Sequence, residues 1–114
     1  MAIASRPPET DIARVDRYCK RRVPPDARDQ VRLETVVRGS AITIIERRAP
    51  WREDLGPEWS RSKLAQLRYD RGTWTLYWAD RNGRWLRYPA LEPSPRLDDL
   101  LAEIDRDPAG AFWG

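Results

Sequence analysis

Apolar residues recur at helical spacing near both ends of the chain. The first apolar stripe runs from about Glu9 to Val23, with acidic residues in its first turn and basic residues in its last, as the helix dipole favours. The second begins at Ser94-Pro95, where we expect Ser94 to be the N-cap and Pro95 the first helical residue. The stripes consist of Ile12, Val15, Cys19 and Val23, and of Leu97, Leu100, Leu101 and Ile104. They predict an amphipathic helix near each end, with Cys19 as a small core residue.

Between these two segments the apolar period changes to two residues, which predicts β-strands. Five strands are expected, at 30–38, 41–48, 63–69, 73–80 and 84–88. Gly39-Ser40, Arg71-Gly72 and Asn82-Gly83 are short turns, and Asn-Gly is the strongest hairpin signal in the chain. The remaining connection, 49–62, is long enough to be functional or to be packed by its own side chains.

The order of helix, five strands and helix predicts an α+β fold, a two-layer sandwich. Its five-stranded sheet is expected to be mainly antiparallel because its turns are short, with the N- and C-terminal helices on one face. Residues 9–114 are expected to form this single domain, and residues 1–8 to be a disordered or frayed tail.

The predicted turns also determine which side chains share a face of the sheet. A two-residue turn at Arg71-Gly72 pairs Tyr69 with Trp74, and one at Asn82-Gly83 pairs Asp80 with Trp85. The face under the helices then collects Val31, Leu33, Val37, Ile42, Ile44, Ala65, Leu67, Tyr69, Trp74, Leu76, Trp78 and Trp85. The uncovered face collects Arg32, Arg38, Thr43, Arg47, Gln66, Arg68, Thr75, Tyr77, Leu86 and Tyr88.

Composition excludes several classes of site. The chain has no histidine and one cysteine, so Ser–His–Asp and Cys–His catalysis, finger-type zinc sites and internal disulfides are ruled out. No apolar run approaches the roughly 18 residues of a membrane span, and the N-terminus lacks the apolar core of a signal peptide. We therefore expect a soluble cytoplasmic protein.

Charge is unevenly distributed along the chain. Residues 1–88 carry 19 Arg and Lys against 12 Asp and Glu, whereas residues 89–114 carry two basic and six acidic residues. Nearly all cations are arginine, whose planar fork suits phosphate, carboxylate and aromatic faces. Two interpretations stay open, because a GC-rich genome also enriches arginine.

Five motifs spread along the chain point to a family. They are Arg21-Arg22-Val23-Pro24-Pro25, Arg28-Asp29-Gln30-Val31-Arg32, Glu46-Arg47-Arg48-Ala49-Pro50-Trp51-Arg52, Thr73-Trp74-Thr75-Leu76-Tyr77-Trp78 and Phe112-Trp113-Gly114. Together they resemble the bacterial family known as domain of unknown function 3024, from about Ile12 to Gly114. The resemblance implies no activity and supplies no site residues. The element order is also similar to frataxin-like two-layer sandwiches, but the basic end of the first helix does not match an acidic iron-handling helix.

Arginines interleaved with tyrosines on an uncovered sheet favour nucleic-acid binding. Tyrosine rings are stacking platforms worth about 1–3 kcal/mol per base, and basic side chains contact phosphates. The candidate residues are Arg17, Lys20, Arg21, Arg22, Arg32, Arg47, Arg68, Tyr77 and Tyr88. The same pattern is also typical of an ordinary solvated sheet face and of helix-dipole compensation.

The long connection supports other hypotheses. Trp51, Arg52 and Trp59 are candidates for docking a partner protein. The neighbouring acids could hold a cation, but their spacing matches no metal motif, so ion pairs with nearby arginines are expected instead. No metal, cofactor or catalytic residue is predicted, although a histidine-free nuclease or metal-dependent phosphoesterase remains an alternative. We expect a non-enzymatic binding module, a monomer or weak dimer, whose partner is nucleic acid or another protein and not a membrane.

Overall fold

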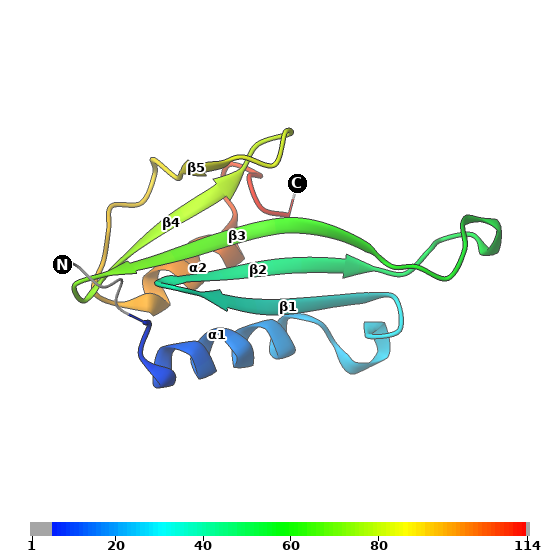
Figure 1. Ribbon diagram of the computed structural model, residues 1–114, viewed down its shortest axis with the longest axis horizontal. Coiled ribbons are helices and arrows are strands. Elements are labelled where there is room, and N and C mark those ends of the chain that lie inside the picture. The colour runs from blue at the N-terminus through cyan, green and yellow to red at the C-terminus, as the bar shows by residue number, and fades with distance from the viewer. Residues whose placement is uncertain (1–5, 114) are drawn as a thin grey trace.

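The structure, a computed structural model, describes residues 6–113. Helix α1 (Glu9–Arg22) and the short 3₁₀ turn η1 (Pro25–Ala27) precede five strands, and helix α2 (Leu97–Arg106) follows them. The strands are β1 (Val31–Arg38), β2 (Ala41–Arg48), β3 (Ser60–Asp70), β4 (Thr73–Ala79) and β5 (Trp85–Arg87), with a second 3₁₀ turn η2 (Glu53–Leu55) between β2 and β3. They form one antiparallel sheet in chain order (Figure 1), which confirms the predicted α+β sandwich. Residues 1–5 of the predicted tail lie outside the described residues, and Pro7 is buried.

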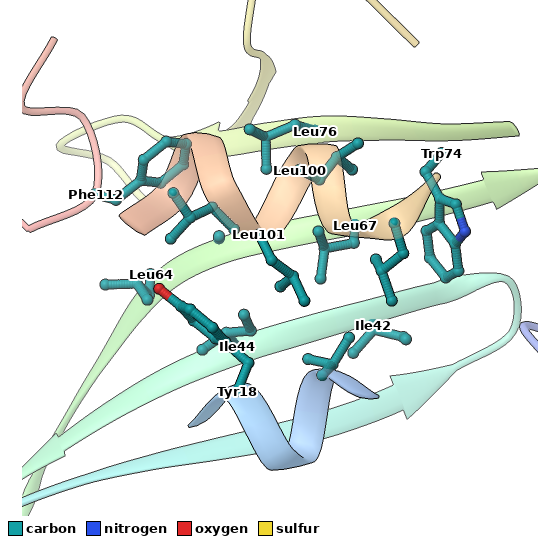
Figure 2. Close-up of a cluster of buried hydrophobic side chains, with 14 of the residues drawn as sticks. Tyr18, Ile42, Ile44, Leu64, Leu67, Trp74, Leu76, Leu100, Leu101 and Phe112 are labelled. Carbon is teal, nitrogen blue, oxygen red and sulfur yellow. The ribbon is translucent and has the colours of Figure 1, made fainter. Parts of the chain in front are cut away.

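The core lies between one face of the sheet and both helices. Figure 2 shows side chains from α1, α2 and the strands meeting in this layer. The largest fully buried members are Val15 of α1, Leu100 and Ile104 of α2, and Ile42, Ile44, Leu67, Trp74 and Leu76 of the sheet. Each such aliphatic side chain stabilises the fold by about 1.5–3 kcal/mol relative to exposure. Neither helix described between residues 6 and 113 lies over the opposite face of the sheet.

The turn between β3 and β4 is the one that the sequence predicts. Tyr69 pairs with Trp74 and Leu67 with Leu76, and the turn residues Arg71 and Gly72 both have positive φ, +52° and +83°. These angles are those of a type I′ turn, which matches the twist of the flanking strands.

The turn between β4 and β5 differs from the prediction by one residue. Ala79, not Asp80, pairs with Trp85, and Tyr77 pairs with Arg87. The loop has three residues, because the Gly83 N–H donates to the Asp80 carbonyl at 2.9 Å and Gly83 adopts a φ of +78°. The Asp80 carboxylate stabilises this loop by accepting from the N–H groups of Asn82 and Arg84.

Because the observed register differs from the predicted one by one residue, every side chain of β5 lies on the face opposite to the one predicted. The predictions for Trp85, Leu86 and Tyr88 are therefore wrong. Trp85 and Arg87 lie on the uncovered face, whereas Leu86 lies opposite Trp78 and Tyr88 is buried in the core.

An irregularity in β3 determines which side chains from the first part of this strand lie on the uncovered face. The pairing shifts between Ile44 and Ile45, whose partners are Ala65 and Lys63, so that Leu64 has no partner and is buried beside Ala65. Strand β3 begins at Ser60, three residues earlier than predicted. The β2–β3 hairpin consequently projects beyond the rest of the molecule (Figure 1).

The start of α2 also differs from the prediction. The helix begins at Leu97 with Arg96 at the N-cap, so Ser94 and Pro95 lie outside it. Ser94 instead exchanges two backbone hydrogen bonds with Trp74, at 2.7 and 2.9 Å, and its hydroxyl donates to Asp99. The prediction that Ser94 is the cap is wrong because the backbone of this residue pairs with Trp74 near the start of β4.

Candidate nucleic-acid interface

The uncovered face of the sheet is strongly basic. The strand pairings place on it Arg32 and Arg38 of β1, Arg47 of β2, Arg61, Lys63 and Arg68 of β3, and Arg87 of β5. Among the described strand positions of this face the acids are Glu34 of β1 and Asp70 at the end of β3. We call this surface the cationic face. It confirms the predicted placement of Arg32, Arg47, Arg68 and Tyr77.

Three arginines of the cationic face form a row across neighbouring strands. Arg32 is directly opposite Arg47, and Arg47 is directly opposite Arg61. Like charges in directly opposite positions destabilise a sheet. Glu34 compensates one of these charges by accepting from Nη1 of Arg47 at 3.2 Å. The buried Nε of Arg47 has no hydrogen-bond partner among residues 6–113.

Three aromatic rings lie among these cations, each with a cation over it. The Arg68 guanidinium lies 3.7 Å from the Tyr77 ring centre, that of Arg32 lies 4.6 Å from the Trp59 ring, and Nζ of Lys63 lies 5.6 Å from the Trp85 ring. Such contacts are worth about 0.5–1 kcal/mol at exposed sites. They place each of these cationic groups against an aromatic ring of the face.

Most of the candidates on α1 are separated from the cationic face. Arg17, Arg21 and Arg22 line an open groove of about 800 Å³ between α1 and α2, in the layer that covers the other side of the sheet. Within this groove Arg22 pairs with Asp105 at 3.2 Å. Lys20 lies closer to the face, since it lines a small hollow at the β1 edge together with Arg32. The structure therefore divides the sequence-predicted site into two.

Tyr88 does not belong to the interface. Only 2% of the residue is exposed, and its hydroxyl donates to the Glu103 carboxylate at 2.8 Å. Burial, and then this hydrogen bond, raise the pKa of Tyr88. Sequence reasoning missed Arg61, Lys63, Trp85 and Arg87. The sequence did contain a signal for Trp85 and Arg87, whose face depends on the length of the preceding loop. Asp80-Arg81-Asn82-Gly83 has the Asp and Gly that a type I turn favours at its first and fourth positions, and such a turn belongs to a three-residue loop.

The three docking candidates do not form one surface. Trp51 lies in the β2–β3 loop with 79% of its surface exposed and the Arg52 guanidinium 5.1 Å from its ring. A hollow beside Trp51 is lined by Val31 and Ser60, whereas Trp59 lies over Arg32 on the cationic face. Trp59 immediately precedes Ser60, the first residue of β3, and alternation along an extended chain directs these two neighbouring side chains to opposite faces.

Two acids in or beside the long connection, Asp54 of the loop and Glu46 of β2, form ion pairs with nearby arginines, as expected. Glu46 accepts from Arg48 at 2.9 Å, and Asp54 pairs with Arg52. The hydrogen bond from Arg52 lowers the pKa of Asp54. Within the described part of the chain, no three Asp, Glu or Cys side chains lie close enough together to hold a metal ion.

Cys19 is a core residue, as predicted. It is 2% exposed, and burial, followed by the nearby Asp16 carboxylate, raises its pKa to about 12. A thiol with so high a pKa is a poor nucleophile, because the thiolate is the reactive form.

Fold and surface together define a small α+β sandwich with one covered and one cationic sheet face. The chain belongs to the family described as a domain of unknown function (DUF3024), whose model matches residues 4–114. No curated protein and no solved structure matches the chain. The similarity to frataxin-like sandwiches stays a prediction. Neither helix between residues 6 and 113 has the length and apolar character that crossing a bilayer requires.

Proposed function

We propose that this protein is a non-enzymatic nucleic-acid-binding module of the bacterial cytoplasm, which binds through the cationic face. The observation that carries this proposal is the row of Arg32, Arg47 and Arg61, directly opposite one another across three strands. Opposite charges at directly opposite strand positions stabilise a sheet, and like charges there destabilise it, so this row does not contribute to the stability of the fold. A phosphate backbone relieves the repulsion and releases its counterions on binding.

The aromatic rings of the face support the same ligand. Tyr77, Trp59 and Trp85 are partly exposed and lie between the cations. Base–aromatic stacking adds about 1–3 kcal/mol per base, and a guanidinium over a ring extends the stacking surface. Phosphate contacts and stacking positions therefore occur together on one side of the molecule.

Salt-dependent binding tests the proposal. Affinity for a labelled oligonucleotide of about 12 residues is expected to fall with salt, the slope of log K against log salt being about −0.7 for each phosphate neutralised in a single strand. The double substitution Arg38→Gln with Arg61→Gln should weaken binding about tenfold or more and make the slope shallower by about 1.4.

The interhelical groove supplies the matched control. Arg17→Gln with Arg21→Gln removes the same charge from exposed positions that lie off the cationic face. This double variant should bind within about twofold of the wild type, since surface substitutions away from a contact have small effects. Equal weakening by both double variants, or no binding by the wild type at low salt, would refute the proposal.

A second candidate function, docking of a partner protein, is favoured by the loop between β2 and β3. Trp51 and Leu55 are 79% and 53% exposed on this projecting hairpin. A photo-cross-linking residue at position 51 should give a discrete adduct in cells, and one at Arg71, an exposed turn of the same sheet, should not. Absence of an adduct specific to position 51 would exclude this function for the loop.

A further inference from the structure

The cationic face is hollowed where β1, β2 and β3 meet the start of β5. The hollow has a volume of about 370 Å³. Val36 and Ile45 form an apolar floor, Trp85 lies at one side, and Arg38, Arg61 and Lys63 surround it. Its volume lies at the lower end of the range for small-molecule pockets, about 300–1,000 Å³. Its size and lining suit one flat, partly apolar group next to negative charge.

Two uncharged polar side chains complete the lining. Nε2 of Gln66 donates to Oγ1 of Thr43 at 3.0 Å, and Oε1 of Gln66 accepts from Nε of Arg68 at 2.7 Å. These bonds orient the Gln66 amide and leave its second N–H and the Thr43 hydroxyl hydrogen to reach a ligand. An apolar floor with a few oriented polar groups is the usual chemistry of a nucleobase pocket.

The position of Lys63 is set by the β4–β5 loop. Its Nζ donates to the Gly83 carbonyl at 2.7 Å and lies 5.6 Å from the centre of the Trp85 ring. An ammonium group has three donors, so two remain for a phosphate. The three-residue loop that turns Trp85 onto this face therefore also places a cation at the margin of the hollow.

A base in a duplex cannot enter such a hollow, because its two faces are stacked and its edge is paired. A base in a single strand can be splayed out, stacked on an aromatic ring and hydrogen-bonded along its edge. We propose that the cationic face binds single-stranded nucleic acid in preference to duplex, with one unstacked base in the hollow beside Trp85 and the flanking phosphates on Arg38 and Arg61. This inference rests on the proposed function.

The test compares a single strand of about 12 nucleotides with its duplex at the same salt concentration. The single strand should bind at least about tenfold more tightly to the wild type. Trp85→Ala should weaken single-strand binding about 5- to 150-fold, the range of one lost base stack, and leave duplex binding unchanged. Trp51→Ala, which removes an exposed tryptophan outside the hollow, is the control and should change neither affinity.

A second measurement needs no substitution. A single strand that carries 5-iodouracil should cross-link to the wild-type protein at Trp85 or at a residue of the hollow on irradiation. Equal affinity for single strand and duplex, or cross-links confined to other surfaces, would overturn the inference while leaving the proposed function in place. Failure to bind either form would reject the proposed function itself.

Discussion

At the scale of single residues, one buried polar pair links the end of β5 to α2. The Tyr88 hydroxyl donates to Glu103 at 2.8 Å, and the Glu103 side chain, 7% exposed, also accepts from Arg106 at 2.6 Å. Tyr88→Phe leaves a buried carboxylate with one partner fewer. We expect it to lower the free energy of unfolding by about 1.5–3 kcal/mol, as measured by urea denaturation.

Tyr77 provides the control for this substitution. It lies on the cationic face, and within residues 6–113 its hydroxyl takes part in no hydrogen bond. Tyr77→Phe should therefore change the free energy of unfolding by less than about 0.5 kcal/mol. A similar loss in both variants would contradict the role assigned to the Tyr88–Glu103 pair.

At the scale of elements, the two hairpin turns on either side of β4 differ in backbone geometry. Arg71 occupies a position with φ of +52°, a conformation that costs a residue other than glycine or asparagine about 1–2 kcal/mol. Arg71→Asn should accordingly raise the free energy of unfolding by about 0.5–1 kcal/mol, since Asn-Gly is the preferred type I′ pair. Its ion pair with Asp70 is about 90% exposed on both sides and contributes little.

Arg81 is the matched control, because it is an exposed arginine in the other turn and does not have a positive φ. Arg81→Asn removes the same charge and should leave stability within about 0.5 kcal/mol of the wild type. Equal effects of the two substitutions in thermal or urea unfolding would show that charge, and not backbone conformation, is responsible.

The elements also show how far local patterns determine the candidate site. Periodicity and turn residues were sufficient to predict both helices, the antiparallel order and the faces of β1, β2 and β4, since their apolar side chains alternate clearly. Strand β5 has only three residues, Trp85–Arg87, and its face depends on whether the preceding loop has two residues or three. The Asp80 side chain decides this through two hydrogen bonds, and the bulge at Leu64 depends equally on tertiary packing.

At the scale of the whole molecule, basic residues predominate on the cationic face, whereas the helix layer carries basic residues on α1 and acidic residues on α2. Seven basic side chains and two acids, Glu34 and Asp70, project from the strands of the cationic face. Acidic residues are concentrated on α2 in the other layer, at Asp98, Asp99, Glu103 and Asp105. Under the proposed function, this distribution would steer a polyanion toward the cationic face, an effect that the modest net charge of +3 does not reveal.

The packing of both helices on the sheet also makes stability sensitive to alkali. Tyr18, Cys19 and Tyr88 are all buried between the two layers, and burial is the largest cause of the raised pKa of each. In the unfolded chain their pKa values return to about 8.5 for cysteine and about 10 for tyrosine. Because each folded pKa is above its unfolded value, the stability contributed is complete below the unfolded pKa and is lost as pH rises above it.

We therefore expect the free energy of unfolding to be nearly constant from about pH 6 to 8, where a chain without histidine has little to titrate. Above about pH 8.5 it should fall, by up to about 1.4 kcal/mol per pH unit for each group that is ionised only when unfolded. Cys19→Ala removes the cysteine, which is the first of these groups to ionise in the unfolded chain. The urea midpoint of this variant should be lower than that of the wild type at neutral pH, because a buried side chain is shortened. Between about pH 8.5 and 10 its midpoint should decline less steeply with pH than that of the wild type. Parallel curves for the two proteins across this interval would mean that the Cys19 thiol is as accessible to solvent in the folded state as in the unfolded one.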